Sequence, residues 1–103
     1  MGKNKYKIKF LPSFSEELNE IVYYITFILK NKTAAENLIQ KVYNEIEKRR
    51  FNPESFELYK SNFSKYSWYR IYVNNFVIFY TVTNNTMKVA HIIYNARNLD
   101  NLL

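Results

Sequence analysis

Residues 68–94 read WYRIYVNNFVIFYTVTNNTMKVAHIIY, and this stretch decides the fold. Apolar runs at residues 68–73, 76–82 and 89–94 are separated only by short polar turns, a pattern that predicts a three-stranded antiparallel meander. The middle run is apolar at consecutive positions, which is typical of a central strand covered on both faces. Because asparagine tolerates a positive φ, Asn74-Asn75 predicts a type I′ turn.

The meander is followed at once by residues 95–103, which read NARNLDNLL. This polar segment holds one arginine, Arg97, and ends in the apolar pair Leu102-Leu103. It is shorter than the roughly 12 to 15 residues that an isolated helix needs, so it is ordered only against an apolar surface or a partner. We expect the working surface of the protein beside this junction of sheet and tail.

The N-terminal part of the chain predicts a strand and then a helix. Residues 6–10 alternate between apolar and lysine side chains, as a half-buried strand does. Pro12 ends the strand, and Ser13 with Glu16 has the spacing of a capping box that begins a helix. An apolar stripe at helical spacing then runs to about residue 30, through Leu18, Ile21, Val22, Ile25, Ile28 and Leu29.

A second helix is predicted to start almost immediately, where Thr33 and Glu36 repeat the capping-box spacing. So short a connection favours an antiparallel helical hairpin. The buried face of this helix is marked by Ala35, Leu38, Ile39, Val42 and Ile46. From residue 51 to 67 the periodicity is lost, but the segment is apolar enough to lie on the domain and cover part of its core.

The predicted order is therefore strand, helix, helix, loop, three strands and tail. The first strand has no neighbour in sequence and must join an edge of the meander. We expect an α+β fold of β-α-α-β-β-β order, in which a two-helix hairpin packs on one face of a four-stranded, mainly antiparallel sheet. The 103 residues suffice for one domain, residues 1–103, and not for two.

Composition narrows the classes of function. The chain has no cysteine and one histidine, so we expect neither a metal site nor a cofactor. No apolar run approaches the roughly 18 residues that span a bilayer, and no signal peptide is visible. We expect a cytoplasmic protein without a membrane partner. The formal charge of +6 favours an acidic partner, although codon bias toward Lys, Asn and Ile explains such an excess equally well.

Two basic clusters each have two readings. Lys5, Lys7 and Lys9 share one face of the first strand, where they either contact phosphates or protect an edge strand from pairing with other chains. The segment Lys48-Arg49-Arg50 either binds phosphate or complements the negative end of a helix dipole. We favour the structural reading of both clusters. His91 is likewise interpreted as a structural strand residue.

Two motifs resemble the RelE/ParE superfamily of toxins from bacterial type II toxin-antitoxin modules. Residues 69–80 read YRIYVNNFVIFY and look like the family's YR-x-x-V-x-N-Y-x-I-x-Y hairpin. Residues 92–99 read IIYNARNL and look like the I-x-H-x-x-R-D ending of the ParE branch. Together with the order of elements, the resemblance covers essentially the whole chain and implies a toxin that a tight antitoxin complex silences.

The resemblance implies two modes of action. RelE-type toxins cleave mRNA on the ribosome, but Val77 stands where their hairpin arginine would be, and residues near Leu103 and Asn95 replace other catalytic positions. A nuclease would have to use Arg70, Tyr94 and Arg97. ParE-type toxins instead poison DNA gyrase by binding.

The ParE ending fits better, although Tyr94 and Asn98 replace its usual histidine and aspartate. The resemblance then implies a target-binding set of Arg70, Tyr94, Arg97 and Asn98. We expect a gyrase-binding toxin with a cognate acidic antitoxin. The alternatives are a ribosome-dependent mRNA endonuclease and a non-toxic member that only binds antitoxin or DNA.

Overall fold

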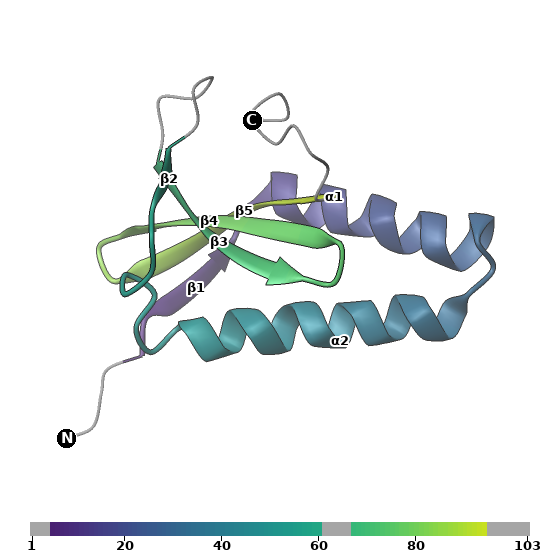
Figure 1. The fold of residues 1–103 in the computed structure, drawn as a ribbon, viewed down its shortest axis with the longest axis horizontal. Coiled ribbons are helices and arrows are strands. Elements are labelled where there is room, and N and C mark those ends of the chain that lie inside the picture. The colour runs from purple at the N-terminus through teal and green to yellow at the C-terminus, as the bar shows by residue number, and fades with distance from the viewer. Residues whose placement is uncertain (1–4, 61–66, 95–103) are drawn as a thin grey trace.

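A computed structural model describes residues 5–60 and 67–94. The elements in chain order are β1 (Lys7–Phe10), α1 (Pro12–Tyr23), the π-helix η1 (Tyr24–Ile28), α2 (Lys32–Arg49), β2 (Tyr59–Lys60), β3 (Ser67–Val73), β4 (Phe76–Thr83) and β5 (Thr86–Tyr94) (Figure 1).

The strands form one sheet in the order β1-β5-β4-β3-β2, in which only the β1–β5 pair is parallel. This arrangement confirms the predicted meander and the predicted placement of the first strand at its edge. The predicted number of four strands was one too few, because β2 adds a fifth strand beside β3. A two-residue strand is too short to produce an alternating pattern, so the sequence did not reveal it.

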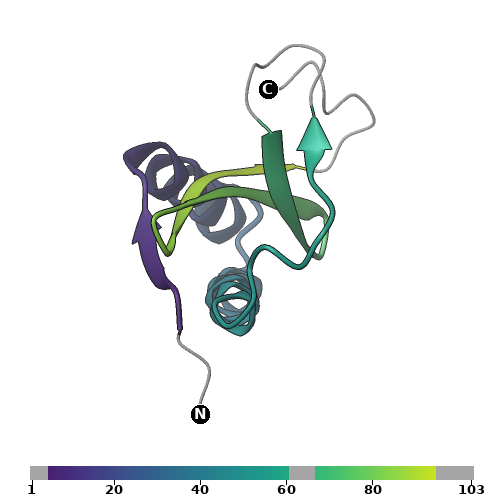
Figure 2. The ribbon, with the colours of Figure 1, turned by 90° about the vertical axis from the view of Figure 1, so that its left-hand side faces the viewer.

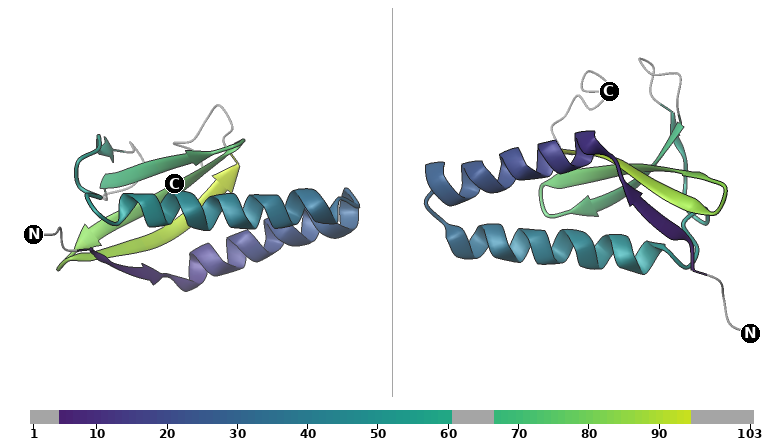
Figure 3. Two further views of the ribbon diagram at one scale, coloured as in Figure 1. Left: turned by 90° about the horizontal axis from the view of Figure 1, so that it is seen from below. Right: turned by 180° about the vertical axis from the view of Figure 1, so that it is seen from behind.

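The two helices run antiparallel and lie on the same side of the sheet, as predicted (Figures 2 and 3). Their apolar stripes meet the inward-facing side chains of β3, β4 and β5. The main core consists of Phe14, Leu18, Leu38, Val42, Ile46, Ile71, Val73, Ile78, Tyr80, Met87, Val89 and Ile92. A smaller cluster on the other face contains Trp68, Val77, Phe79 and Ala90. Strand β4 contributes buried residues to both clusters, as its continuous apolar run predicted.

The backbone groups along the outer edge of β5 find hydrogen-bond partners first in a strand and then in a helix. Strand β1 pairs with residues Thr86–Val89 of β5, and α1 then continues alongside the rest. Ser13 Oγ donates to the carbonyl of Ala90 at 2.6 Å, and a carboxylate oxygen of Glu17 accepts the N–H of Ile92 at 3.0 Å. Two side chains of α1 thus replace the missing neighbour strand.

This use of Ser13 corrects the predicted capping box. Helix α1 begins at Pro12 after Leu11, and no side chain caps its N-terminus. The hydroxyl of Ser13 is already engaged by the sheet, so it does not cap α1. A box between Thr33 and Glu36 was also wrong, because Asn31 caps α2 by accepting the N–H of Ala34 at 3.1 Å. Asparagine is among the best N-cap residues, and it stands at the position that begins α2.

The hairpin turns use asparagine as expected, but the turn types differ from the prediction. In the β3–β4 turn, Asn74 has φ 53° and Asn75 is not in the positive region, which is the pattern of a type II′ turn. In the β4–β5 turn both Asn84 and Asn85 have positive φ, at 52° and 62°, as type I′ requires. The type I′ turn therefore lies one hairpin later than predicted.

A tyrosine ties the end of α2 and the following loop to the sheet. The hydroxyl of Tyr80 is buried, donates to the carbonyl of Pro53 at 2.7 Å and accepts from Arg49 Nη1 at 2.9 Å. Burial raises the pKa of this hydroxyl, while the hydrogen bond from Arg49 lowers it. Arg49 also lies over the ring of Phe56 at 3.5 Å.

The other two residues of the segment Lys48-Arg49-Arg50 also make contacts within the chain. Arg50 Nε donates to the carbonyl of Tyr6 at 3.1 Å, and Lys48 pairs with Glu45. These contacts support the structural reading of Lys48-Arg49-Arg50.

We predict that Tyr80→Phe lowers the free energy of unfolding by about 1–3 kcal/mol. The substitution keeps the packed ring but removes the hydroxyl that serves both the Pro53 carbonyl and Arg49. Urea denaturation followed by circular dichroism measures the change.

Tyr69 supplies a matched control, because its ring stacks on that of Tyr80 with centroids 5.2 Å apart. Its hydroxyl has no hydrogen bond within the part of the chain that the structure describes. Tyr69→Phe should change stability by less than about 0.5 kcal/mol. Equal losses in the two variants would contradict the assigned role of the Tyr80 hydroxyl.

Candidate partner-binding site

An apolar depression on the described surface lies where the end of α1 meets the end of β5. It is a groove of about 460 Å³ lined by Glu20, Ile21, Tyr24, Ile25, Leu29, Asn75, Phe76 and Tyr94. Helix α1 and η1 form one wall, while the β3–β4 turn and the last residue of β5 form the other. Glu20 is the one charged side chain among these residues.

The apolar surface continues outward from the groove over the tip of the helical hairpin. Here Tyr23, Tyr24, Phe27, Ile28 and Leu29 are each 53–64% exposed. An exposed apolar patch of adjoining side chains is uncommon on a soluble monomer and marks an interaction site. We call the groove and these exposed side chains together the tip surface.

The exposure of Ile28 and Leu29 corrects the predicted buried stripe of the first helix. The stripe reaches Ile25, but beyond it the helix widens into η1, where the N–H of Leu29 donates to the carbonyl of Tyr24 at 2.9 Å. That five-residue spacing shifts the phase of the side chains, so the α-helical period no longer predicts which face is buried. Such single π-turns are frequent at functional sites.

Helix η1 ends at Ile28, and Lys30 then adopts φ 54°. This left-handed conformation costs a non-glycine residue about 1–2 kcal/mol. It lets the N–H of Asn31 donate to the carbonyl of Ile25 at 3.0 Å, and α2 starts directly afterwards. The chain thus turns within a few residues and leaves Phe27, Ile28 and Leu29 exposed at the end of the molecule.

Tyr94, a predicted target-binding residue, lies in the wall of the groove. It is 60% exposed, and its ring makes an edge contact with Phe76, with centroids 5.9 Å apart. Phe76 packs against the main core, so Tyr94 lies on the face of the sheet that carries the helices.

Arg70 lies on the opposite face of the sheet. It alternates along β3 with Ile71, which belongs to the main core. Its guanidinium lies over the ring of Tyr59, 4.5 Å from the centroid, and 5.8 Å from that of Tyr72. The structure therefore does not bring Arg70 and Tyr94 together. Arg97 and Asn98 lie outside the described residues.

Neither Val77 nor His91 has a place at the groove. Val77 is fully buried in the smaller cluster. The Nδ1 atom of His91 lies 3.0 Å from Glu17 Oε2, and its ring makes an edge contact with Trp68 at 5.6 Å. These contacts support the interpretation of His91 as a structural strand residue.

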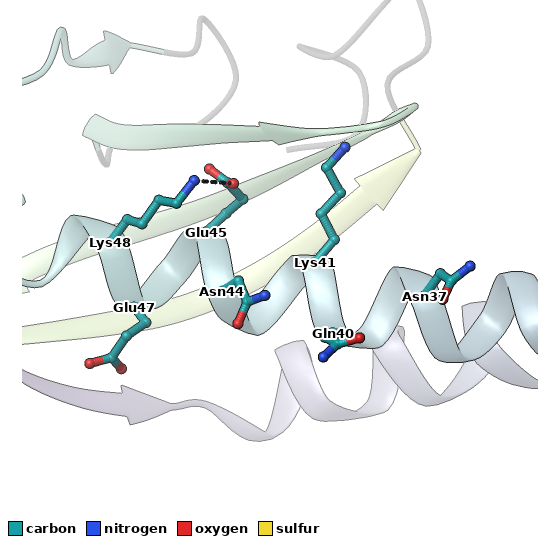
Figure 4. A pocket seen from close by; sticks show the side chains of 7 residues that line it. All are labelled: Asn37, Gln40, Lys41, Asn44, Glu45, Glu47 and Lys48. Carbon is teal, nitrogen blue, oxygen red and sulfur yellow. Dashed lines mark hydrogen bonds and ion pairs between the residues drawn. The ribbon is translucent and has the colours of Figure 1, made fainter.

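A second depression lies on the outer surface of α2, and the side chains that line it all carry polar or charged groups (Figure 4). The one ion pair drawn there joins the exposed Lys48 to the partly exposed Glu45 at 3.0 Å. Exposed pairs of this kind contribute about 0–1 kcal/mol. We interpret this depression as the solvated face of the helix.

The tip surface offers apolar and aromatic side chains and one carboxylate, that of Glu20. In residues 5–60 and 67–94 no three His, Asp or Glu side chains group as metal ligands. No helix of the described chain is long and apolar enough to cross a membrane.

Tyr24, Phe27 and Phe76 were not predicted to belong to a binding surface. Their signal was the run YYITFIL at residues 23–29, which is apolar on more sides than one buried stripe requires.

No curated protein matches this sequence. Among solved structures, the chain is similar to one described as the chromosomal ParDE TA system from P. aeruginosa, with a TM-score of 0.69 and 11% identity. The match covers 89% of this chain and 98% of that chain, and at so low an identity it shows the fold alone. The model of the ParE toxin of the type II toxin-antitoxin system parDE matches residues 8–99. The chain therefore belongs to the ParE toxin family of type II toxin-antitoxin systems.

Proposed function

We propose that this toxin arrests growth by binding DNA gyrase and that a cognate acidic antitoxin neutralises it in the cytoplasm by docking on the tip surface. The observation that carries the proposal is the exposed apolar groove that ends at Tyr94. The inhibitor itself breaks no bond in this account.

The placement of the candidate residues supports binding over nuclease chemistry. Cleavage of RNA needs a proton acceptor and a cation within reach of one phosphate. Arg70 and Tyr94 lie on opposite faces of the sheet, so they do not converge on one phosphate. Val77, at the position of the RelE-type arginine, is fully buried. Both facts weigh against the ribosome-dependent mRNA endonuclease as the alternative.

The shape of the tip surface supports an antitoxin segment as its occupant. A groove with one helical wall and exposed aromatic and aliphatic side chains suits a short amphipathic helix that inserts its apolar residues. Aromatic residues are typical anchors of such interfaces. The formal charge of +6 attracts an acidic partner and speeds its encounter.

Tyr94 links the two parts of the proposal. It belongs to the predicted target-binding set, and it also forms a wall of the groove. A segment seated in the groove covers Tyr94 and adjoins the point where residues 95–103 begin. Antitoxin and gyrase would then compete for one part of the toxin surface, and neutralisation needs no change of conformation.

We predict that the purified chain increases the amount of covalent gyrase–DNA cleavage complex and that Tyr94→Ala reduces this effect at least about tenfold. Truncation of an exposed anchor at an interface commonly costs this much affinity. Supercoiled plasmid, gyrase and a gel that resolves linearised DNA measure it. Tyr43→Ala, at an exposed tyrosine of α2 outside the groove, should retain the effect.

The gyrase proposal is wrong if the chain neither traps cleavage complexes nor binds a gyrase subunit. Primer extension on ribosome-bound mRNA decides the alternative: new cuts at fixed codon positions would establish the endonuclease. Growth that is unaffected by induction of this chain alone would indicate a non-toxic member.

We predict that Tyr24→Ala weakens antitoxin binding at least about tenfold, because Tyr24 lies in the groove wall and its ring area is lost from the interface. Tyr72→Ala is the matched control: Tyr72 is 52% exposed and Tyr24 is 53% exposed, but Tyr72 lies on the other face of the sheet. Titration calorimetry with the small acidic protein expected from the adjacent reading frame gives both affinities. Equal effects of the two substitutions would remove the tip surface as the docking site.

A further inference from the structure

Three lysines that are distant in sequence lie together on the face of the sheet opposite the helices. Lys7 and Lys9 belong to β1, and Lys88 belongs to β5. The parallel register places Lys9 directly beside Lys88, and Lys7 beside Thr86. Neighbouring strands are about 4.8 Å apart, so the ammonium groups of all three lysines can reach one anionic ligand.

The alternation of the strands fixes the face on which these lysines lie. Ile8 of β1 and its partner Met87 of β5 pack in the main core on the helix side. Because side chains alternate across a strand, the residues on either side of them point to the other face. Lys7 and Lys9 are exposed and Lys88 is partly exposed there.

Protection of an edge strand from pairing with other chains explains Lys7 and Lys9 but not Lys88. Lysines on an exposed edge prevent pairing with other chains, and β1 is such an edge. Strand β5, however, has β1 on one side and β4 on the other, so Lys88 protects no edge. A like-charge pair directly across two strands is also unfavourable for the fold itself. An anionic ligand that offsets the repulsion between Lys9 and Lys88 would account for this pair.

No acidic residue neutralises the cluster within the described chain. The ion pairs there involve Lys48, Arg50 and His91, and none of the three sheet lysines. The adjoining strand β4 adds hydroxyl groups instead of carboxylates. Thr81 lies opposite Lys88, and Thr83 lies opposite Thr86 on the same face. Ammonium and hydroxyl groups together are the usual donors to phosphate oxygens.

We propose that Lys7, Lys9 and Lys88 form a binding site for the phosphodiester backbone of nucleic acid. A nucleic acid fits better than a protein partner, because lysine is depleted from the cores of protein interfaces and no exposed aromatic anchor lies within the cluster. The contacts reach phosphates and not base edges, so the site does not select sequence. The inference goes beyond the gyrase and antitoxin proposals and does not depend on either.

The test compares two triple variants of the full chain that each lose three positive charges. One is Lys7→Gln, Lys9→Gln and Lys88→Gln. The control is Lys32→Gln, Lys41→Gln and Lys48→Gln on α2, where Lys41 and Lys48 project from the helix (Figure 4). Fluorescence anisotropy measures binding to a duplex DNA of about 20 base pairs and to a single-stranded RNA of the same length, over roughly 50–300 mM salt.

We expect the sheet variant to bind at least about tenfold more weakly than the unmodified chain. The slope of log K against log salt should become shallower by about 2–3, because each lost phosphate contact on duplex DNA contributes roughly 0.9. The α2 control should change the slope by less than about 1. Circular dichroism spectra of the unmodified chain and both variants should agree.

Three outcomes would overturn the proposal: equal weakening by both triple variants, an unchanged slope in the sheet variant, or no binding of either polymer by the unmodified chain at low salt. Similar losses on DNA and RNA support a general backbone site, and a loss on one polymer alone supports the site and names its ligand. The sheet variant changes no residue of the groove, so antitoxin binding through Tyr24 is tested separately from this site.

Discussion

The rest of the structure depends on which groups hydrogen-bond to the backbone along the outer edge of β5. Strand β1 pairs with the first part of this edge, and Ser13 and Glu17 of α1 complete it by hydrogen bonds to Ala90 and Ile92. A buried backbone group without a partner costs about 1–3 kcal/mol, so these two side chains hold α1 alongside β5. The direction of α1 follows, because the chain enters it from a strand parallel to β5. The helix must then end beside Tyr94, and this is where the groove forms.

The same constraint separates two surfaces of different chemistry. The tip surface is apolar and lies at the end of the helical hairpin, beside the end of β5. The lysine cluster lies on the opposite face of the sheet and near the start of β5. Binding of one partner therefore leaves the other surface accessible. The two proposals are therefore compatible, with an apolar site for a protein segment and a separate cationic site for a phosphate backbone.

Much of the fold could be predicted from the sequence, because β3, β4 and β5 are long apolar strands joined by asparagine turns and both helices have apolar stripes. Local signals that depend on tertiary partners failed. Ser13 looked like a cap, but its hydroxyl bonds to the sheet. Ile28 looked buried, but η1 changes the helical phase and no described element packs over the hairpin tip.

The candidate site was predictable only in part. Tyr94 was singled out through the family motif, and the structure places it in the groove wall. Arg70 was grouped with it through the resemblance to the family, but alternation along β3 points Arg70 to the other face. The remaining wall residues come from α1 and η1, which are far from the motif in sequence. Only the three-dimensional course of α1 beside β5 brings them to Tyr94.

Hydrogen exchange of the backbone amides, with and without the antitoxin, tests the tip surface most directly. We expect the antitoxin to slow exchange in peptides that cover residues 20–31 and 75–76, while peptides of the outer face of α2 at residues 41–48 stay unchanged. Residues 20–31 lie at the end of the molecule, where amides of a short π-turn exchange readily unless a partner covers them. Protection confined to other segments, with residues 20–31 unaffected, would contradict the proposed docking of the antitoxin in the groove.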